Sequence, residues 1–127
     1  MSDKLPAVTQ TDDQLESEKY ISSILSDRIN LCFPYDQLKD AAKSTQVFYK
    51  TDHHWTAEGA KVGFDALMTA MNEDIPQVSY NIETVKDFHG TLYSKAPTDF
   101  SAADEMHFYT NPDNSVKAVS YTHLTLP

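Results

Sequence analysis

The stretch of residues 48–60 constrains the fold of this chain most, because it predicts a strand and a helix joined within a few residues. The aromatic pair at residues 48–49 is typical of the end of a strand. Thr56 is a predicted helix N-cap, and Glu58 comes after it in the first turn, where the helix dipole favours an anion. The polar residues between these two elements therefore lie in a strand-to-helix joint.

Asp52 and His54 are the residues of this joint that can carry chemistry. In extended backbone, residues two apart point to the same side, so we expect Asp52 beside His54 and His53 on the opposite side. On a helix, Asp52 and His54 would diverge by about 200°. A carboxylate beside an imidazole fixes the tautomer of the ring, whose other nitrogen can then take a proton from a hydroxyl.

The same residues allow two other interpretations. Imidazole nitrogen and carboxylate oxygen are both ligands of zinc, so Asp52, His53 and His54 are also candidate metal ligands. Alternatively, an Asp-x-His pair can be part of a capped structural turn with no chemical role. The spacing alone leaves all three interpretations open.

The joint resembles a known family signature. Residues 49–56, with the sequence YKTDHHWT, are followed by Gly59 and Ala60, and this run resembles the signature of the bacterial DHHW family. It is also similar to the Asp-x-His-Trp block of SGNH-hydrolase-like enzymes, including the alginate O-acetyltransferases. A second stretch, residues 88–96 with the sequence FHGTLYSKA, resembles the segment downstream of the signature in that family. Together the two matches span about residues 20 to 110.

The resemblance implies roles for particular residues. Asp52 matches the orienting acid of the SGNH-like relatives and His54 matches the base, while no cofactor is implied. The relatives carry their nucleophilic serine downstream in a Gly-Asp-Ser or similar element, and neither Gly-Asp nor Asp-Ser occurs in this chain. Ser94 lacks the flanking glycines of an exposed nucleophile. Candidate substrate-binding residues are three aromatic side chains that offer stacking faces: Tyr49, Trp55 and Tyr93.

Hydrophobic spacing predicts the remaining elements. Helices are expected at 13–26, 35–42 and 57–72, strands at 29–33, 46–49 and 78–82, a helical turn at Thr84, and a hairpin pairing 106–109 with 115–120. The apolar stripes of the first and third helices, which include Tyr20, Ile24, Phe64, Leu67 and Met71, are expected to form core. This alternation, together with the resemblance, predicts part of an SGNH-like three-layer α/β/α fold with a short parallel sheet, in a fragment of a larger domain.

The chain divides into three predicted parts. Residues 1–12 are a disordered or extended arm, residues 13–119 a partial SGNH-like domain, and residues 120–127 a non-native, adapter-like tail. The single cysteine, Cys32, lies among apolar residues and is expected to be a buried thiol without a disulfide partner. His107 is expected to be a structural or surface residue.

Net charge and hydropathy limit the possible partners. A net charge of −9 argues against nucleic acid and anionic membrane surfaces as partners. No apolar stretch approaches the roughly 20 residues of a membrane span. The resemblance implies a parent esterase or O-acyltransferase acting on ester groups of a cell-envelope carbohydrate, with this fragment inactive alone. The alternatives are a carbohydrate-binding module and a metal-dependent hydrolase.

Overall fold

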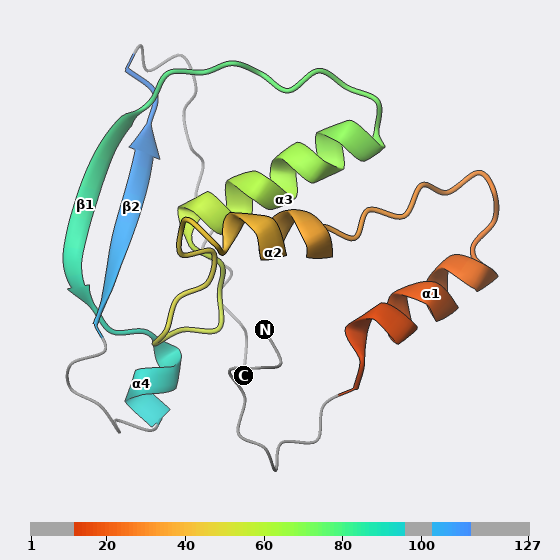
Figure 1. Cartoon of the computed structure of the whole chain (residues 1–127). Coiled ribbons are helices and arrows are strands. Elements are labelled where there is room, and N and C mark those ends of the chain that lie inside the picture. The colour runs from red at the N-terminus through yellow and green to blue at the C-terminus, as the bar shows by residue number, and fades with distance from the viewer. Residues whose placement is uncertain (1–11, 96–102, 113–127) are drawn as a thin grey trace, which may run out of the picture.

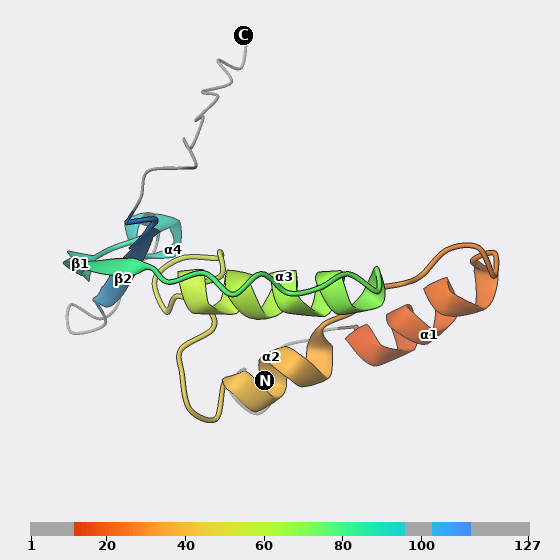
Figure 2. The same ribbon diagram turned by 90° about the horizontal axis from the view of Figure 1, so that it is seen from above.

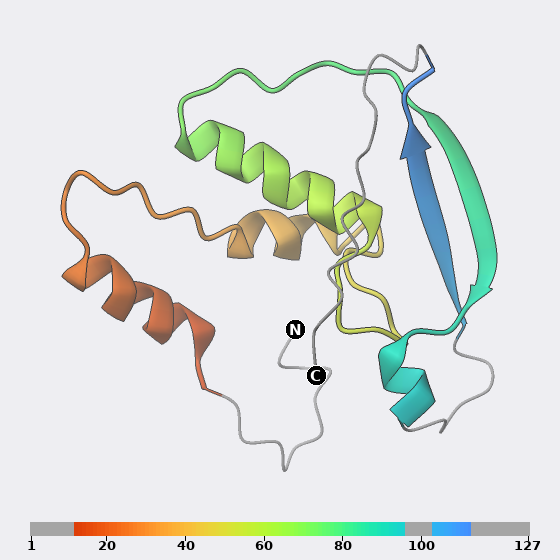
Figure 3. The same ribbon diagram turned by 180° about the vertical axis from the view of Figure 1, so that it is seen from behind.

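The computed structural model describes residues 12–95 and 103–112, which form helices and one antiparallel pair of strands (Figure 1). The elements are α1 (Gln14–Ile24), α2 (Tyr35–Ala41), α3 (Ala57–Ala70), β1 (Asn81–Phe88), α4 (Thr91–Lys95) and β2 (Asp104–Thr110). Helices α1, α2 and α3 confirm the three predicted helices. Helices α2 and α3 pack against each other, and the N-terminal end of α3 lies nearest the strands (Figures 1 and 3).

Side-chain caps fix where the two longer helices begin. The Asp13 carboxylate accepts a hydrogen bond from the backbone N–H of Leu15 at 2.9 Å, which caps α1. The Thr56 hydroxyl accepts the N–H of Gly59 at 3.1 Å and donates to the carbonyl of Gln46 at 2.6 Å. Thr56 therefore caps α3, as predicted, and also ties the start of α3 to the segment before the joint.

The parallel sheet that the sequence predicted is absent from the described residues. Residues 29–33 are irregular, and the segment 46–49 contributes only an isolated antiparallel bridge between Phe48 and Trp55. The carbonyl of Val47 accepts the N–H of Thr56 at 3.1 Å, so part of the hydrogen-bonding capacity of this segment is used by the loop after it. Of the predicted three-layer α/β/α fold with a short parallel sheet, the mixture of helices and strands is observed, but the parallel sheet is not among the described residues.

The observed sheet pairs β1 with β2 in an antiparallel register from Asn81–Thr110 to Phe88–Asp104. Thr84, expected in a helical turn, lies in β1 instead. Residues 106–109 pair with β1, whereas their expected partner, 115–120, lies outside the described residues. The register is irregular between Val85 and Phe88, where Asp87 adopts a φ of 60°. This irregularity places Phe88 opposite Asp104 at the end of the sheet nearest α4.

Helix α3 buries a face of small residues, and not the large apolar face that the sequence favoured. Its buried residues are Gly59, Gly63 and Ala66, whereas Phe64 is 46% exposed and Met71 is 57% exposed. A Cβ atom on Gly63 would overlap the ring of Trp55, so the ring packs against the helix where it has no side chain. The expectation that Phe64, Leu67 and Met71 form core was wrong for the described residues.

Helix α1 shows the same discrepancy. It stands apart from α3 and from the strands (Figures 1 and 2) and buries none of its own residues. Tyr20 and Ile24, expected in the core, are 67% and 64% exposed. Cys32, in the irregular segment after α1, is half-buried and so less enclosed than predicted. The amphipathic spacing predicted the helix correctly, but none of the described residues covers the apolar stripe of α1.

Candidate acid–base site

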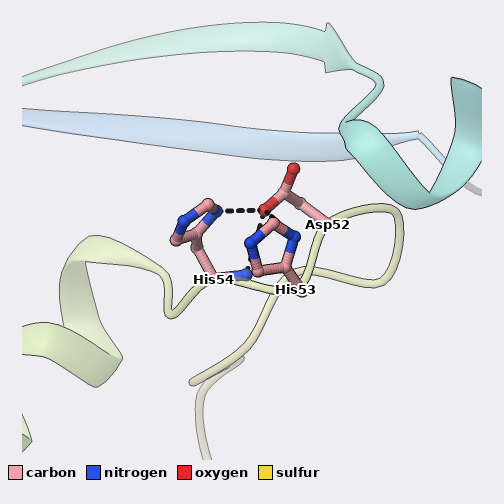
Figure 4. Close-up of side chains that lie close together, drawn as sticks. All are labelled: Asp52, His53 and His54. Atoms are coloured by element: carbon pink, nitrogen blue, oxygen red, sulfur yellow. Dashed lines mark hydrogen bonds and ion pairs between the residues drawn. The ribbon is translucent and has the colours of Figure 1, made fainter. Parts of the chain in front are cut away.

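Asp52 and His54 are in contact in the loop that precedes α3 (Figure 4). The Oδ1 atom of Asp52 lies 2.5 Å from the Nδ1 atom of His54 and accepts the backbone N–H of His54 at 2.9 Å. The loop bends here and is not extended, so a local Asx-type turn brings the two residues together. The predicted proximity of Asp52 and His54 is therefore confirmed, although a turn produces it and not the extended backbone that was predicted.

His53 does not point to the opposite side, as extended backbone would require. Its ring centroid lies 3.9 Å from that of His54 at an interplanar angle of 38°, and its Nδ1 atom lies 3.7 Å from Oδ1 of Asp52. Figure 4 shows both imidazoles beside the same carboxylate. The bend places all three side chains of residues 52–54 on one side of the loop, which corrects the prediction for His53.

The second oxygen of Asp52 is held by residues that come after β1. Oδ2 accepts the backbone N–H of Thr91 at 2.8 Å and the Thr91 hydroxyl at 3.1 Å. A Cβ atom on Gly90 would overlap the Asp52 side chain, so glycine permits this close approach. The N–H of Thr91 lowers the pKa of Asp52 well below its ordinary value, and the donors of His54 add to this effect. Asp52 is thus a buried, ionised acceptor.

The loop is anchored from β2 by a second carboxylate, Asp104, which is 1% exposed. It accepts the backbone N–H of Thr51 at 2.9 Å and the Thr51 hydroxyl at 2.7 Å. It also accepts the N–H of Lys50 at 3.0 Å and the side-chain amide of Gln46 at 2.6 Å. Burial opposes the charge of Asp104, but these donors outweigh burial and lower its pKa.

Thr51 joins the anchor to the segment after β1. Its hydroxyl oxygen accepts the N–H of Gly90 at 3.0 Å, and its carbonyl accepts the N–H groups of Leu92 and Tyr93 at 3.0 and 3.2 Å. The first turn of α4 is thereby fixed on the loop, with Thr91 against Asp52. Sequence reasoning missed Thr51, Thr91 and Asp104, because their partners are 37 or more residues away in the chain.

The aromatic candidates for substrate binding occupy separate places. The ring of Tyr49 lies 5.1 Å from that of Phe88, and the ring of Tyr93 lies 4.2 Å from that of His89. Burial raises the pKa of Tyr49, and the charge of Glu58 raises it further. Tyr93 lies on α4, and its backbone N–H donates to the carbonyl of Thr51 in the neighbouring loop.

Trp55 lies with a different set of residues. It contributes to an apolar pocket of about 310 Å³ that also contains Phe33, Tyr35 and Leu38, and neither Asp52 nor His54 lines this pocket. The structure therefore does not bring Trp55 into one pocket with Asp52 and His54. The substrate-binding roles of Tyr49, Trp55 and Tyr93 stay predictions.

A second carboxylate–imidazole contact connects α3 to β2. Glu58 Oε1 lies 2.5 Å from the Nδ1 atom of His107 and accepts the hydroxyl of Tyr109 at 2.8 Å. Burial opposes the charge of Glu58, but the hydrogen bond from His107 helps lower its pKa. This cluster holds the start of α3 against the sheet, which agrees with the structural role expected for His107.

Comparison with known proteins identifies the class. Residues 2–119 match the SGNH hydrolase-like domain, acetyltransferase AlgX, and the chain belongs to this family. The resemblance that the sequence motifs indicated is thereby confirmed.

Among solved structures, the fold is similar to that of a DHHW family protein from Eubacterium siraeum, with a TM-score of 0.68 and 24% sequence identity. The match covers 84% of this chain and 37% of that protein, so the chain spans little more than a third of its length. No curated protein matches the sequence. Within the described residues, no helix has the length and apolar character of a membrane span.

Proposed function

We propose that this chain supplies the base and the orienting acid of an SGNH-like esterase or O-acyltransferase. His54 is the general base and Asp52 is the carboxylate that orients it. One observation carries the proposal: the hydrogen bond between His54 Nδ1 and the ionised Asp52. Because Asp52 can only accept, Nδ1 carries the proton, and Nε2 of neutral His54 presents a lone pair. The His54 side chain is 69% exposed, so this nitrogen is open to approach.

The nucleophile is proposed to lie outside these 127 residues. Ser94, the alternative within α4, donates its hydroxyl to the carbonyl of Thr91 at 2.9 Å, a contact within its own helical turn. His54 would take the proton of the serine hydroxyl as its oxygen attacks the ester carbonyl, and would then return a proton to the leaving alcohol. On this proposal, residues 13–119 are one part of a larger SGNH-like domain and are inactive alone.

The proposed substrate is an ester group on a cell-envelope carbohydrate, which also implies an extracytoplasmic location. The family includes acetyltransferases in its description, which supports an acetyl ester as the transferred group. Water as the acceptor would give an esterase, and a sugar hydroxyl would give a transferase.

A metal-dependent hydrolase has less support from the geometry. Ligand atoms of Asp52, His53 and His54 do lie within 4.8 Å of one another. However, Oδ1 of Asp52 already receives two donors from His54, and Oδ2 receives two from Thr91. A cation would have to displace these donors from a carboxylate whose acceptor positions are filled. The arrangement therefore supports an acid–base role over metal ligation.

A carbohydrate-binding module is the second candidate, and the pocket beside Trp55 favours it. The Trp55 side chain is 41% exposed, and the pocket next to it has aromatic walls from Phe33 and Tyr35. Aromatic faces of this kind can stack on the apolar faces of sugars. This candidate predicts sugar binding that depends on Trp55 and does not require His54.

The deciding experiment compares the chain alone with the chain extended by the continuation of its reading frame. We expect acetyl release from an acetylated carbohydrate only for the extended protein. His54→Ala should remove nearly all turnover, because the base is lost, and Asp52→Asn should lower turnover strongly. His89→Ala is the control, since this exposed histidine contacts neither residue through a described hydrogen bond. Turnover that survives His54→Ala would refute the assignment.

A further inference from the structure

His53 is joined to the same carboxylate as His54, but through a hydroxyl. Its Nδ1 atom lies 2.9 Å from Oγ1 of Thr91, and Oγ1 of Thr91 lies 3.1 Å from Oδ2 of Asp52. The His53 side chain is 59% exposed, and its ring lies against that of His54. The buried carboxylate of Asp52 is therefore linked by hydrogen bonds to two imidazoles, directly to that of His54 and through the Thr91 hydroxyl to that of His53.

The direction of each hydrogen bond in this network is determined by Asp52. The ionised carboxylate can only accept, so the Thr91 hydroxyl donates its one proton to Oδ2. The Thr91 oxygen is then an acceptor toward His53, and Nδ1 of His53 must be the donor. In the neutral ring, Nε2 of His53 consequently carries a lone pair. His54 reaches the same tautomer through its direct bond to Asp52.

We propose that His53 binds the acceptor: its Nε2 atom accepts a hydrogen bond from a hydroxyl of the sugar that receives the acyl group. This inference rests on the proposed function. Because the ring centroids of His53 and His54 lie 3.9 Å apart, a sugar with one hydroxyl held by His53 has the hydroxyl on the neighbouring carbon close to the His54 ring. The preferred acceptor is thus a carbohydrate with hydroxyls on adjacent carbons.

In the transfer step, the proton passes through His54 and none passes through His53. The acceptor oxygen bound near His54 attacks the carbonyl carbon of the acyl-serine ester, and a new ester bond forms as the bond to the serine oxygen breaks. The acceptor proton moves to Nε2 of His54 and from there to the serine oxygen. His53 holds the neighbouring hydroxyl throughout and sets the position of the acceptor.

The tautomer of His53 can be tested on the full 127-residue chain by NMR with ¹⁵N-labelled histidine. At a pH where the imidazoles are neutral, we expect both His53 and His54 to carry the proton on Nδ1. Thr91→Val removes the hydroxyl, so His53 should shift toward the Nε2–H form while His54 keeps its tautomer. Thr91→Ser retains the hydroxyl and should leave both rings unchanged. An Nε2–H tautomer of His53 in the unaltered chain, or no response to Thr91→Val, would overturn the arrangement.

The binding role is tested in the extended, active protein. His53→Asn keeps an amide donor near the place of Nδ1 and removes Nε2, whereas His53→Gln keeps a polar group near the place of Nε2. Loss of one hydrogen bond predicts an increase of about 2- to 10-fold in the KM for the sugar acceptor in His53→Asn. This increase should exceed any change in the hydrolysis of the acyl donor by water, and His53→Gln should show a smaller increase.

The outcomes separate the two proposals. An unchanged KM for the acceptor in His53→Asn, in a protein whose turnover depends on His54, overturns the role of His53 alone. Turnover that is independent of His54 overturns the proposed function and with it the acceptor role. The tautomer assignment of His53 is decided by the NMR measurement in either case.

Discussion

Removal of the Asp104 carboxylate should destabilise the loop that carries Asp52 and His54, the proposed acid–base pair. In Asp104→Ala, the backbone N–H and the hydroxyl of Thr51 lose a buried charged acceptor. A buried donor left without a partner costs about 1–3 kcal/mol, so these two donors predict a loss of about 2–6 kcal/mol in the free energy of unfolding. The donors of Lys50 and Gln46 lie in exposed residues and can bond to water, so we assign them no further cost.

Urea denaturation monitored by the fluorescence of Trp55, the single tryptophan, measures this loss. Asp104→Asn is the matched variant: it keeps the shape of the side chain but turns an amide N–H₂ toward donors, and we expect a smaller loss. Glu105→Gln, a change at the exposed neighbour, should stay within about 0.5 kcal/mol of the unaltered chain. If Asp104→Ala also stays within that range, the anchoring role assigned to Asp104 is wrong.

Two further predictions concern stability. The folded pKa values of Asp52 and Asp104 are lowered, so in acid the unfolded chain binds more protons than the folded chain. The two carboxylates therefore stabilise the folded chain above the unfolded pKa of about 3.9, and this stabilisation is lost as the pH falls through the lowered folded values. The urea midpoint should therefore fall between pH 6 and pH 3, by less in Asp104→Asn, and a constant midpoint would contradict the assignment. Gly63→Ala gains about 1 kcal/mol of helix propensity but forces the Trp55 ring away at a cost of about 1–3 kcal/mol. We expect a net loss and altered Trp55 emission, and a more stable protein with unchanged emission would show that the ring does not pack there.

The helices could be predicted because their signals are local. Asp13 and Thr56 cap helices whose apolar residues recur at helical spacing, and each cap bonds to a residue within three positions of it. The contact between Asp52 and His54 is equally local, since the residues are two apart. A turn and an extended strand both place them together, so the contact was predicted although the conformation was not.

The sheet and the support of the site could not be predicted from the same signals. The pairing of β1 with β2 joins segments on either side of α4, and an apolar run such as 29–33 does not reveal whether a partner strand exists. Asp104 lies in a polar stretch that resembles a surface loop, and only its position opposite Phe88 brings it under Thr51. Burial of a polar residue by distant contacts has no periodic signature.

The dependence of the loop at residues 50–52 on Asp104 has a consequence for the order in which the protein forms during synthesis. The ribosome produces Asp52 and His54 well before it produces the carboxylate that anchors their loop. The loop therefore gains the hydrogen bonds from Lys50 and Thr51 to Asp104 only after β2 has been synthesised. A nascent chain that ends before Asp104 would carry the signature residues and helix α3 without the carboxylate that accepts both donors of Thr51.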